Sequence, residues 1–219
     1  MTTTVLPDRR QRRRLETIEE IVGVAVEVMS EQGVGGLSLG EVARRMGIRP
    51  PSLYVYFDSK AAVYDAVFTR GWRSVDDVME PVYADVNGAA DLTGFLLRAG
   101  SVYLRWTIEH PVYAQLMNWR PVPGYEPSEE AYAAAVGTLD AGLVAFARLV
   151  ERGLLREGLT AERLLTAWTV LLTGVMTQQL ANAPQESFEH GRFTSTLPEL
   201  VSMYAVHYGR TAPSTKGRR

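Results

Sequence analysis

The clearest structural signal in the chain is the segment Leu37–Lys60, which reads LSLGEVARRMGIRPPSLYVYFDSK. Ser38 stands before a short amphipathic run and Glu41 follows three residues later, a pattern typical of a capping box at a helix start. Gly47 ends that helix, and the Pro-Pro pair that follows opens another, because proline is tolerated in a first helical turn. Two short helices joined by a glycine-containing turn predict a helix-turn-helix unit.

The side chains of this segment separate into an inward and an outward set. The inward set follows the helical period and consists of Val42, Ala43, Met46, Ile48, Leu53 and Phe57. The outward set of the second helix consists of Arg49, Pro50, Ser52, Tyr54, Val55 and Tyr56. Two tyrosines, a serine and an arginine on one exposed face suit a recognition helix in the major groove of DNA. Packing of the two tyrosines on the surface of the domain is the alternative.

The polar members of the outward set have the chemistry of DNA contacts. Tyrosine and serine hydroxyls donate to phosphate oxygens, and such contacts fix the register of a protein on the duplex. The Arg49 guanidinium has the geometry to pair with guanine O6 and N7. Lys60 begins the next helix, where its ammonium group and the partial positive charge of the helix N-terminus both favour a phosphate.

The rest of the chain is also predicted to be helical, because apolar residues recur three and four apart and no strand-like alternation is bounded by hairpin signals. The expected helices cover about 12–32, 39–46, 50–57, 60–81, 91–109, 111–118, 128–152, 160–183 and 192–208. A second capping box, Thr17 with Glu20, leaves open a later start for the first of them. The predicted fold class is therefore all-α, with about nine helices and an N-terminal three-helix domain that carries the helix-turn-helix.

Composition and charge suggest how the chain is divided. We expect a disordered basic arm over 1–11, a helix-turn-helix domain over 12–71 with its motif at 38–57, a second domain over 72–209 and a disordered tail over 210–219. Although the net charge is −2, five arginines and one acid occupy residues 1–14. Such a cluster is either an ordinary solvated segment or a grip on the DNA backbone or minor groove.

Several function classes are disfavoured by the sequence. The chain has no cysteine, and its three histidines are far apart without ligand spacing, so we predict no metal site and no cofactor. No acid/base pair, nucleophile motif or phosphate loop supports an enzyme, and no catalytic residue is assigned. Neither a signal peptide nor about 18 uninterrupted apolar residues is found, so we expect a cytoplasmic protein with no membrane partner.

The N-terminal segment resembles the DNA-binding domain of the tetracycline-repressor (TetR) family. The resemblance covers about residues 12–71 and rests on a first helix ending in glycine, the string LSLGEVARRMGI, and the run S-L-Y-x-Y-F-x-S-K ending at Lys60. It implies that the two tyrosines and Lys60 contact phosphates, while Arg49, Pro50 and Val55 lie against base edges. The complete candidate DNA-binding set is Ser38, Arg49, Pro50, Ser52, Tyr54, Val55, Tyr56 and Lys60. Arg49 and two prolines stand where the family usually opens with serine or threonine, so base preference does not carry over.

The resemblance also implies a role for the second domain. It would bind a small molecule and dimerise through the last two long helices, 160–183 and 192–208. A two-fold dimer places two recognition helices about 34 Å apart, which calls for a palindromic operator. The candidate ligand-binding residues are Trp72, Tyr103, Trp106, Tyr113, Met117, Trp168 and Met176. Some of them flank the break between two helices at His110, where a pocket could form. Plain core packing is the alternative for each.

Two further polar positions are left open by the sequence. His110 is expected to be a capping or surface residue in preference to a ligand contact. Gln178 and Gln179 suit either a hydrogen bond across the dimer or a place in the pocket.

These inferences combine into one functional prediction. We expect a homodimeric transcriptional repressor that is released from its operator when a small, largely apolar effector tilts the fourth helix. An activator of the same family is one alternative. The other is an α-helical small-molecule-binding protein that no longer binds DNA.

Overall fold

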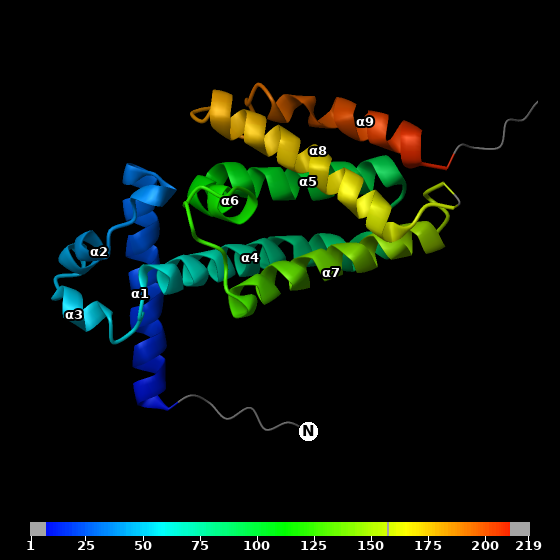
Figure 1. Cartoon of the computed structure of the whole chain (residues 1–219). Helices are drawn as coiled ribbons and strands as arrows, with labels where there is room; N and C mark the ends of the chain where they lie inside the picture. The colour runs from blue at the N-terminus through cyan, green and yellow to red at the C-terminus, as the bar shows by residue number, and fades with distance from the viewer. Residues whose placement is uncertain (1–7, 157, 211–219) are drawn as a thin grey trace, which may run out of the picture. The chain divides into compact units, whose positions relative to one another are not determined.

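The computed structural model describes residues 8–156 and 158–210. Over these residues it contains nine α-helices, three 3₁₀ helices and no strand beyond one isolated bridge, which confirms the predicted all-α class (Figure 1). The predictions for residues 1–7 and 211–219, the outer parts of the basic arm and the tail, lie outside the described residues. Contacts divide the chain into two compact units: one runs up to Gly71 and includes Val112–Tyr132, and the other holds Trp72–Pro111 and the chain from Ala133 onward.

The first unit is built around the apolar stripe of its first helix. Its elements are α1 (Arg9–Gln32), η1 (Val34–Gly36), α2 (Leu39–Arg45), α3 (Pro50–Leu53), the first half of α4 (Lys60–Ala84) and, from Val112, α6 (Pro111–Asn118). The buried side chains of α1 are Ile21, Val22, Ala25, Val28 and Met29. Of the predicted inward set, Val42, Ala43, Leu53 and Phe57 are buried, whereas Met46 and Ile48 are half-buried. The inward pattern read from the sequence is therefore the core of this unit.

Helix α1 begins earlier than expected. Arg9–Gln11 are helical and do not belong to a disordered arm, because the Asp8 carboxylate caps the helix by accepting a hydrogen bond from Arg10 N at 2.6 Å. The Thr17 capping box does not start the helix. Thr17 lies in its interior, where the hydroxyl donates to the Arg13 carbonyl oxygen at 2.9 Å.

Residues 112–132 were expected in the second domain but cluster with the first unit. Helix α6 packs on α4 where Gly71 has no side chain, since an added Cβ would lie 2.6 Å from Met117 Sδ and 3.0 Å from Tyr113 Cδ1. The loop after α6 is held by Tyr125, whose hydroxyl donates to Asp65 Oδ1 at 2.8 Å. These contacts join residues far apart in the sequence, so local patterns did not reveal them.

The second unit is a stack of longer helices. It contains the rest of α4, η2 (Asp85–Gly88), α5 (Leu92–Glu109), α7 (Glu129–Glu151, from Ala133), α8 (Ala161–Asn182), η3 (Thr194–Thr196) and α9 (Leu197–Tyr208). Helices α8 and α9 lie side by side on α5 (Figure 1). The predicted caps are confirmed, because the Asp91 carboxylate accepts from Gly94 N at 2.7 Å and the Thr160 hydroxyl accepts from Arg163 N at 3.3 Å.

Two helix ends in this unit differ from the sequence prediction. Helix α4 continues through Pro81 to Ala84, and Val82 after the proline is buried in the core. Helix α9 begins at Leu197 instead of residue 192. The backbone N–H groups of Phe193 and Thr194 donate to a side chain of α8 instead of entering the helix.

The side chain that binds Phe193 and Thr194 is that of Gln179 on α8. It is fully buried, and its Oε1 accepts hydrogen bonds from Phe193 N at 2.9 Å and Thr194 N at 3.3 Å. Its Nε2 donates to the Ala183 carbonyl oxygen at 2.7 Å. Gln179 is thus satisfied within its own unit, by neither a dimer contact nor a pocket, while the exposed Gln178 accepts a hydrogen bond from Asn182 Nδ2 at 2.8 Å.

Two helices of the second unit are long and apolar enough to cross a membrane by length and composition alone. They are α7 and α8, and 33% and 39% of their most apolar windows are buried within the fold. Core helices of soluble proteins meet the same test, so this finding is weak evidence for a membrane span.

A cluster of four charged residues ties α1 to α2. The Glu41 carboxylate accepts from Arg44 Nη2 at 2.7 Å and Arg45 Nε at 2.8 Å, and Arg45 Nη2 lies 2.5 Å from Glu31 Oε2 on α1. The predicted capping box is half formed, because Ser38 Oγ accepts from Glu41 N at 3.4 Å while the Glu41 carboxylate turns to the arginines. The hydrogen bonds from Arg44 and Arg45 lower the pKa of Glu41 to about 2.

The seat of α6 on α4 predicts the effect of an added methyl group. Gly71→Ala must push Met117 and Tyr113 aside, and overpacking of this kind costs about 1–3 kcal/mol. Gly137→Ala is the matched control, because its Cβ would meet nothing within 4 Å and alanine is the better helix former. Chemical unfolding should show Gly71→Ala less stable than the wild type and Gly137→Ala at least as stable. Equal stability of the two variants would argue against the α4–α6 contact.

The low pKa of Glu41 predicts a pH dependence of stability. A lowered carboxylate pKa contributes stability above the ordinary value of 4.5, and this contribution is lost as the pH falls toward about 2. Between pH 5 and pH 2 the wild type should therefore lose more unfolding free energy than Glu41→Gln. The control is Glu27→Gln, at an exposed position of α1, which should follow the wild type. Parallel pH curves for Glu41→Gln and the wild type would contradict the expectation.

Candidate nucleic-acid interface

The turn between α2 and α3 is fixed by backbone contacts. Ile48 N donates to the Ala43 carbonyl oxygen at 3.0 Å, and Gly47 adopts a φ of 67°, which glycine accepts without strain. Helix α3 is shorter than predicted and ends at Leu53. Because Tyr56 N and Phe57 N both donate to the Leu53 carbonyl oxygen, at 2.9 and 3.1 Å, the chain continues as a tight turn that still returns Phe57 to the core.

The predicted outward set lies at the surface. Tyr54 is 54% exposed and Val55 66%, while Leu53 beside them is completely buried. The other exposed members are Arg49, Pro50 and Ser52, and Tyr56 is half-buried. One short segment therefore presents a basic group, two phenols, a hydroxyl and an apolar side chain together, supported from below by Leu53 and Phe57.

Two candidates lie just outside this segment. Ser38 is exposed, and its hydroxyl is engaged as the cap of α2. Lys60 is exposed at the start of α4, with its ammonium nitrogen 5.5 Å from the centre of the Tyr64 ring. Tyr64 is itself buried and donates to the Val34 carbonyl oxygen at 2.9 Å, so it holds the lysine over a fixed surface.

Arg14 reaches this surface from α1, a contact that sequence reasoning missed. Its Nη1 donates to the Val55 carbonyl oxygen at 3.1 Å, and its guanidinium carbon lies 5.3 Å from the centre of the Tyr56 ring. The arginine run of residues 9–14 was visible in the sequence. The contact joins residues 41 positions apart, so no local pattern could assign it.

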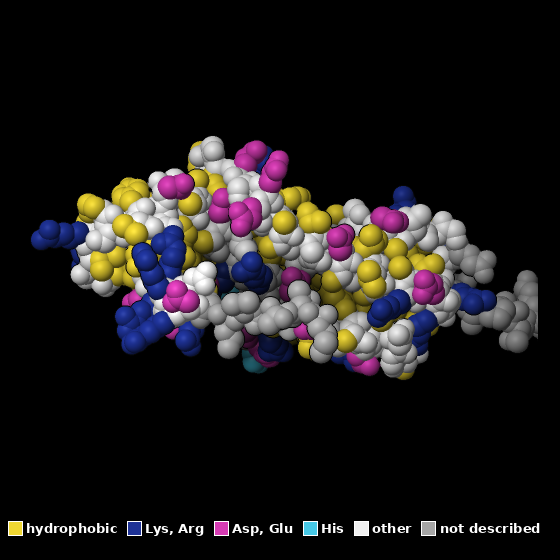
Figure 2. All heavy atoms as spheres, turned by 90° about the horizontal axis from the view of Figure 1, so that it is seen from below, with side chains coloured by type: hydrophobic (Ala, Val, Ile, Leu, Met, Phe, Trp, Pro, Cys, Tyr) yellow, Lys and Arg dark blue, Asp and Glu magenta, His cyan; other side chains and the backbone are white. Residues whose placement is uncertain are grey.

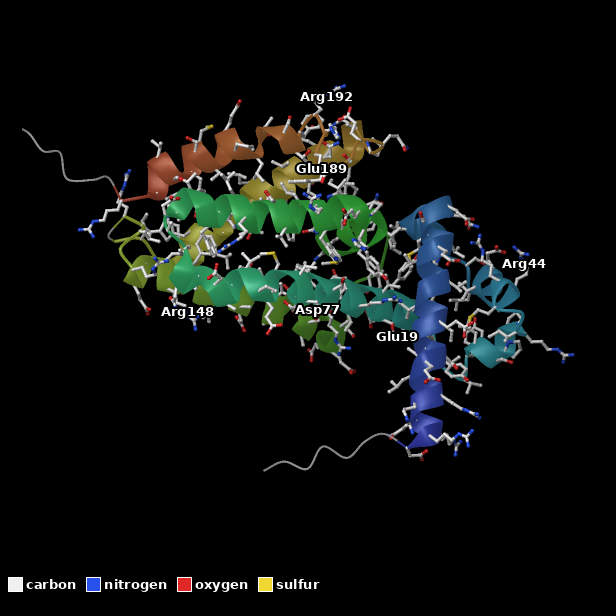
Figure 3. All side chains as sticks on the ribbon, turned by 180° about the vertical axis from the view of Figure 1, so that it is seen from behind. Glu19, Arg44, Asp77, Arg148, Glu189 and Arg192 are labelled. Atoms are coloured by element: carbon white, nitrogen blue, oxygen red, sulfur yellow. The ribbon has the colours of Figure 1, made fainter. Side chains whose placement is uncertain are left out.

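Another cationic side chain of the domain points elsewhere. Figure 3 shows Arg44 projecting outward from α2, and its guanidinium is already paired with Glu41. Glu19 of α1 lies 3.6 Å from the Arg70 guanidinium, which joins α1 to α4. These pairs stabilise the domain and leave the outward set of α3 accessible.

The seven candidate ligand-binding residues divide between the two units. Tyr113 and Met117 lie on α6 in the first unit, above Gly71. Trp106 is buried in the second unit, where its Nε1 donates to Ser74 Oγ at 3.0 Å. The remaining candidates, Trp72, Tyr103, Trp168 and Met176, also belong to the second unit.

Trp168 and Met176 are among the buried candidates. Trp168 meets the ring of Tyr204 edge-on at 5.5 Å, and Met176 has no exposed surface. His110 stacks on Trp106, and its Nδ1 lies 2.8 Å from the Trp106 carbonyl oxygen, in the capping position expected for it. Tyr103 is half-buried.

Two open grooves of the second unit are lined by other residues. One, of about 500 Å³, lies between α4 and α7. Its charged lining residues are Asp76, Asp77, Glu80 and Arg148, with small apolar residues among them. Figure 3 shows Asp77 and Arg148 on the same side of this helix pair. Burial raises the pKa of Tyr83, which also lines this groove, to about 12. The other groove, of about 330 Å³, lies between α7 and α8.

No group of three or more potential ligand side chains is placed to hold a metal ion within the described ranges.

Comparison with known proteins agrees with this geometry. Residues 21–67 match the model of the bacterial regulatory proteins of the tetR family. The uncharacterized HTH-type transcriptional regulator YobS of Bacillus subtilis is 30% identical over 97 residues, which cover 44% of this chain and 49% of that protein. The negative transcriptional regulator IcaR of the Staphylococcus aureus biofilm operon icaADBC is 36% identical over 47 residues, covering 22% of this chain and 25% of that protein. The chain thus matches at most about half the length of these two relatives.

The fold likeness extends over most of the chain. The transcriptional regulator FadR from Bacillus subtilis, solved in complex with stearoyl-CoA, superposes with a TM-score of 0.65 at 15% identity. The match covers 85% of this chain and 97% of FadR. YobS and IcaR, the two relatives matched in sequence, are both named as transcriptional regulators. Residues 21–67 of this chain are thus similar to the N-terminal domain of the bacterial regulatory proteins of the tetR family.

Proposed function

We propose that this protein is a sequence-specific, DNA-binding transcriptional regulator that acts in the cytoplasm. The observation that carries the proposal is the exposed surface from Arg49 to Tyr56 above the buried Leu53 and Phe57. Tyr54, Tyr56 and Lys60 bind phosphates and set the register on the duplex, with Ser38 and Ser52 beside them. Arg49, Pro50 and Val55 lie against base edges in the major groove.

The proposed functional unit is a homodimer formed through α8 and α9. Large apolar side chains are left exposed on both helices: Val170 on α8 is 66% exposed, and Met203 and Val206 on α9 are 67% and 73% exposed. Because Met203 and Val206 are three residues apart, they share one face of α9. We call the stretch Arg49–Tyr56 the recognition segment. A symmetric pairing of the exposed faces of α8 and α9 presents the two recognition segments of the dimer to a palindromic operator.

The proposed mode of regulation is repression that a small, largely apolar effector relieves. FadR, which shares the fold, was solved with an acyl-CoA, and IcaR is a negative regulator. The candidate effector contacts remain the aromatic and methionine side chains Trp72, Tyr103, Trp106, Tyr113, Met117, Trp168 and Met176. Helix α4 belongs to both units, with Lys60–Gly71 in one and the rest in the other, so a tilt of α4 carries the signal to the DNA-binding domain.

Loss of DNA binding on substitution of the outward set tests the central proposal. Tyr54→Ala with Lys60→Ala should abolish the specific complex with DNA from upstream of the gene in a mobility-shift assay, with folding retained. Lys60→Gln should lower the salt slope of binding by roughly 0.9 for one lost charge contact to phosphate. Tyr54→Phe removes a neutral hydroxyl, so it should weaken binding and leave the salt slope unchanged. Arg49→Ala should relax specificity at one base-pair position by about 1–3 kcal/mol.

The matched controls for these changes lie on α7. Tyr132→Phe and Arg148→Gln alter the same kinds of side chain at exposed positions, and they should leave binding unchanged. A wild-type protein without a sequence-specific complex at moderate salt would overturn the proposal. It would favour an α-helical small-molecule-binding protein.

Disruption of α8 and α9 tests the proposed dimer. Val170→Glu and Met203→Glu each place a charge in the apolar face, so light scattering should report a monomer. Val144→Glu on α7, at a position 52% exposed, is the control and should remain dimeric. A dimer that persists in the first two variants and is lost in the third would place the interface on α7.

A further inference from the structure

The first turns of α1 form a charged arm that projects beyond the core of its domain. From Arg9 to Glu16 every residue is exposed, and the first buried residue of the helix is Ile21. Five of the eight residues from Arg9 to Glu16 are arginines. These first turns of α1 therefore contribute no side chain to the hydrophobic core. Core packing does not account for their run of arginines.

The arginines of this arm are largely unpaired within the part of the chain that the structure describes. None of Arg9, Arg10, Arg12 and Arg13 forms an ion pair with any described residue. Arg9 and Arg13 lie four residues apart on one helix face, and like charges at this spacing repel. An anionic partner would relieve this repulsion.

The arm is attached to the recognition segment and forms a polar groove with it. Arg14 makes the attachment through the Val55 carbonyl oxygen, at 3.1 Å, and through the ring of Tyr56, at 5.3 Å. The groove has a volume of about 740 Å³ and is lined by Asp8, Arg9, Arg10, Arg13, Arg14, Thr17, Val55 and Tyr56. Figure 2 shows Lys and Arg side chains gathered at this N-terminal end of α1. The site thus combines uncompensated guanidinium groups with two residues of the proposed DNA-reading surface.

We propose that the N-terminal turns of α1 are a second DNA-binding element, in which Arg9, Arg10 and Arg13 bind phosphates of the backbone flanking the base pairs read by the Arg49–Tyr56 segment. Arg14 is a positioning residue that holds the arm against this segment. Guanidinium groups bind phosphate oxygens through paired charge-assisted hydrogen bonds. Because Arg9 and Arg13 are one helical turn apart, about 6 Å along the axis, they face the same stretch of backbone. This inference rests on the proposed function.

The arm is tested by the salt dependence of DNA binding. The triple variant Arg9→Gln, Arg10→Gln and Arg13→Gln should lower the slope of log K against log salt by about 3 per protomer, at roughly 0.9 for each lost phosphate contact. Its preference among operator sequences should not change, because phosphate contacts carry no base information. Arg12→Gln is the matched control: it removes the same charge from the same helix at a position that does not line the groove. If Arg12→Gln lowers the slope by one third of the loss seen in the triple variant, its charge counts as much as each charge in the groove. The groove then has no specific role.

Arg14→Lys tests the positioning role. Lysine keeps the charge but lacks the planar fork that holds the Val55 carbonyl and the Tyr56 ring, so the variant should lose part of the same salt slope. Its effect should vanish in the background of the triple variant, since both changes disable one element. Additive effects would contradict a positioning role and assign Arg14 its own phosphate.

Shortening the DNA separates this inference from the proposed function. Removal of the base pairs that flank a mapped operator should weaken wild-type binding to the level of the triple variant and leave the triple variant unaffected. If the wild type binds an operator specifically, yet neither the triple variant nor the shortened DNA changes the salt slope, the arm proposal fails alone. If the wild type forms no specific complex, both proposals fail together.

Discussion

The burial of Leu53 and Phe57 is the constraint on which the proposed interface depends. Leu53 has no exposed surface and Phe57 only 7%, and both backbone bonds that close the turn after α3 end on the Leu53 carbonyl oxygen. With these two side chains inward, Tyr54 and Val55 have no place but the surface. A helix as short as α3 is not stable alone, so its presentation to DNA is a property of the packed domain.

Local signals in the sequence predicted the helices well, and long-range contacts account for the differences. The caps at Ser38, Asp91 and Thr160 bind N–H groups three residues further on. The local sequence was therefore sufficient to predict where these helices begin. The late start of α9 depends on Gln179, which binds backbone groups 14 and 15 residues away. Side-chain reach of this kind leaves no periodic trace in a single sequence.

The candidate sites differ in the same way. The outward set could be predicted because a helical period assigns residues to faces. The turn after α3 keeps the same division, with Phe57 buried and Tyr54 and Val55 exposed. The link from Arg14 to Val55 could not, since it depends on where α1 crosses the domain. Tyr113 and Met117 were grouped with the other candidates by residue type, and the sequence did not reveal that both lie over Gly71. Residue type alone does not separate a ligand wall from a helix crossing.

The packing of the first unit limits how an effector can act. Buried side chains join the recognition segment, α1, α2 and the start of α4. The Glu31–Arg45–Glu41 cluster ties α1 to α2, and Arg14 ties α1 to the recognition segment. Closely packed interiors do not deform continuously, so a small effector has little free energy with which to remodel this unit internally. Under the proposed function, the effector binds more tightly to the state in which α4 is tilted. The tilt reorients the first unit, and the DNA-contacting surface moves with it as one body.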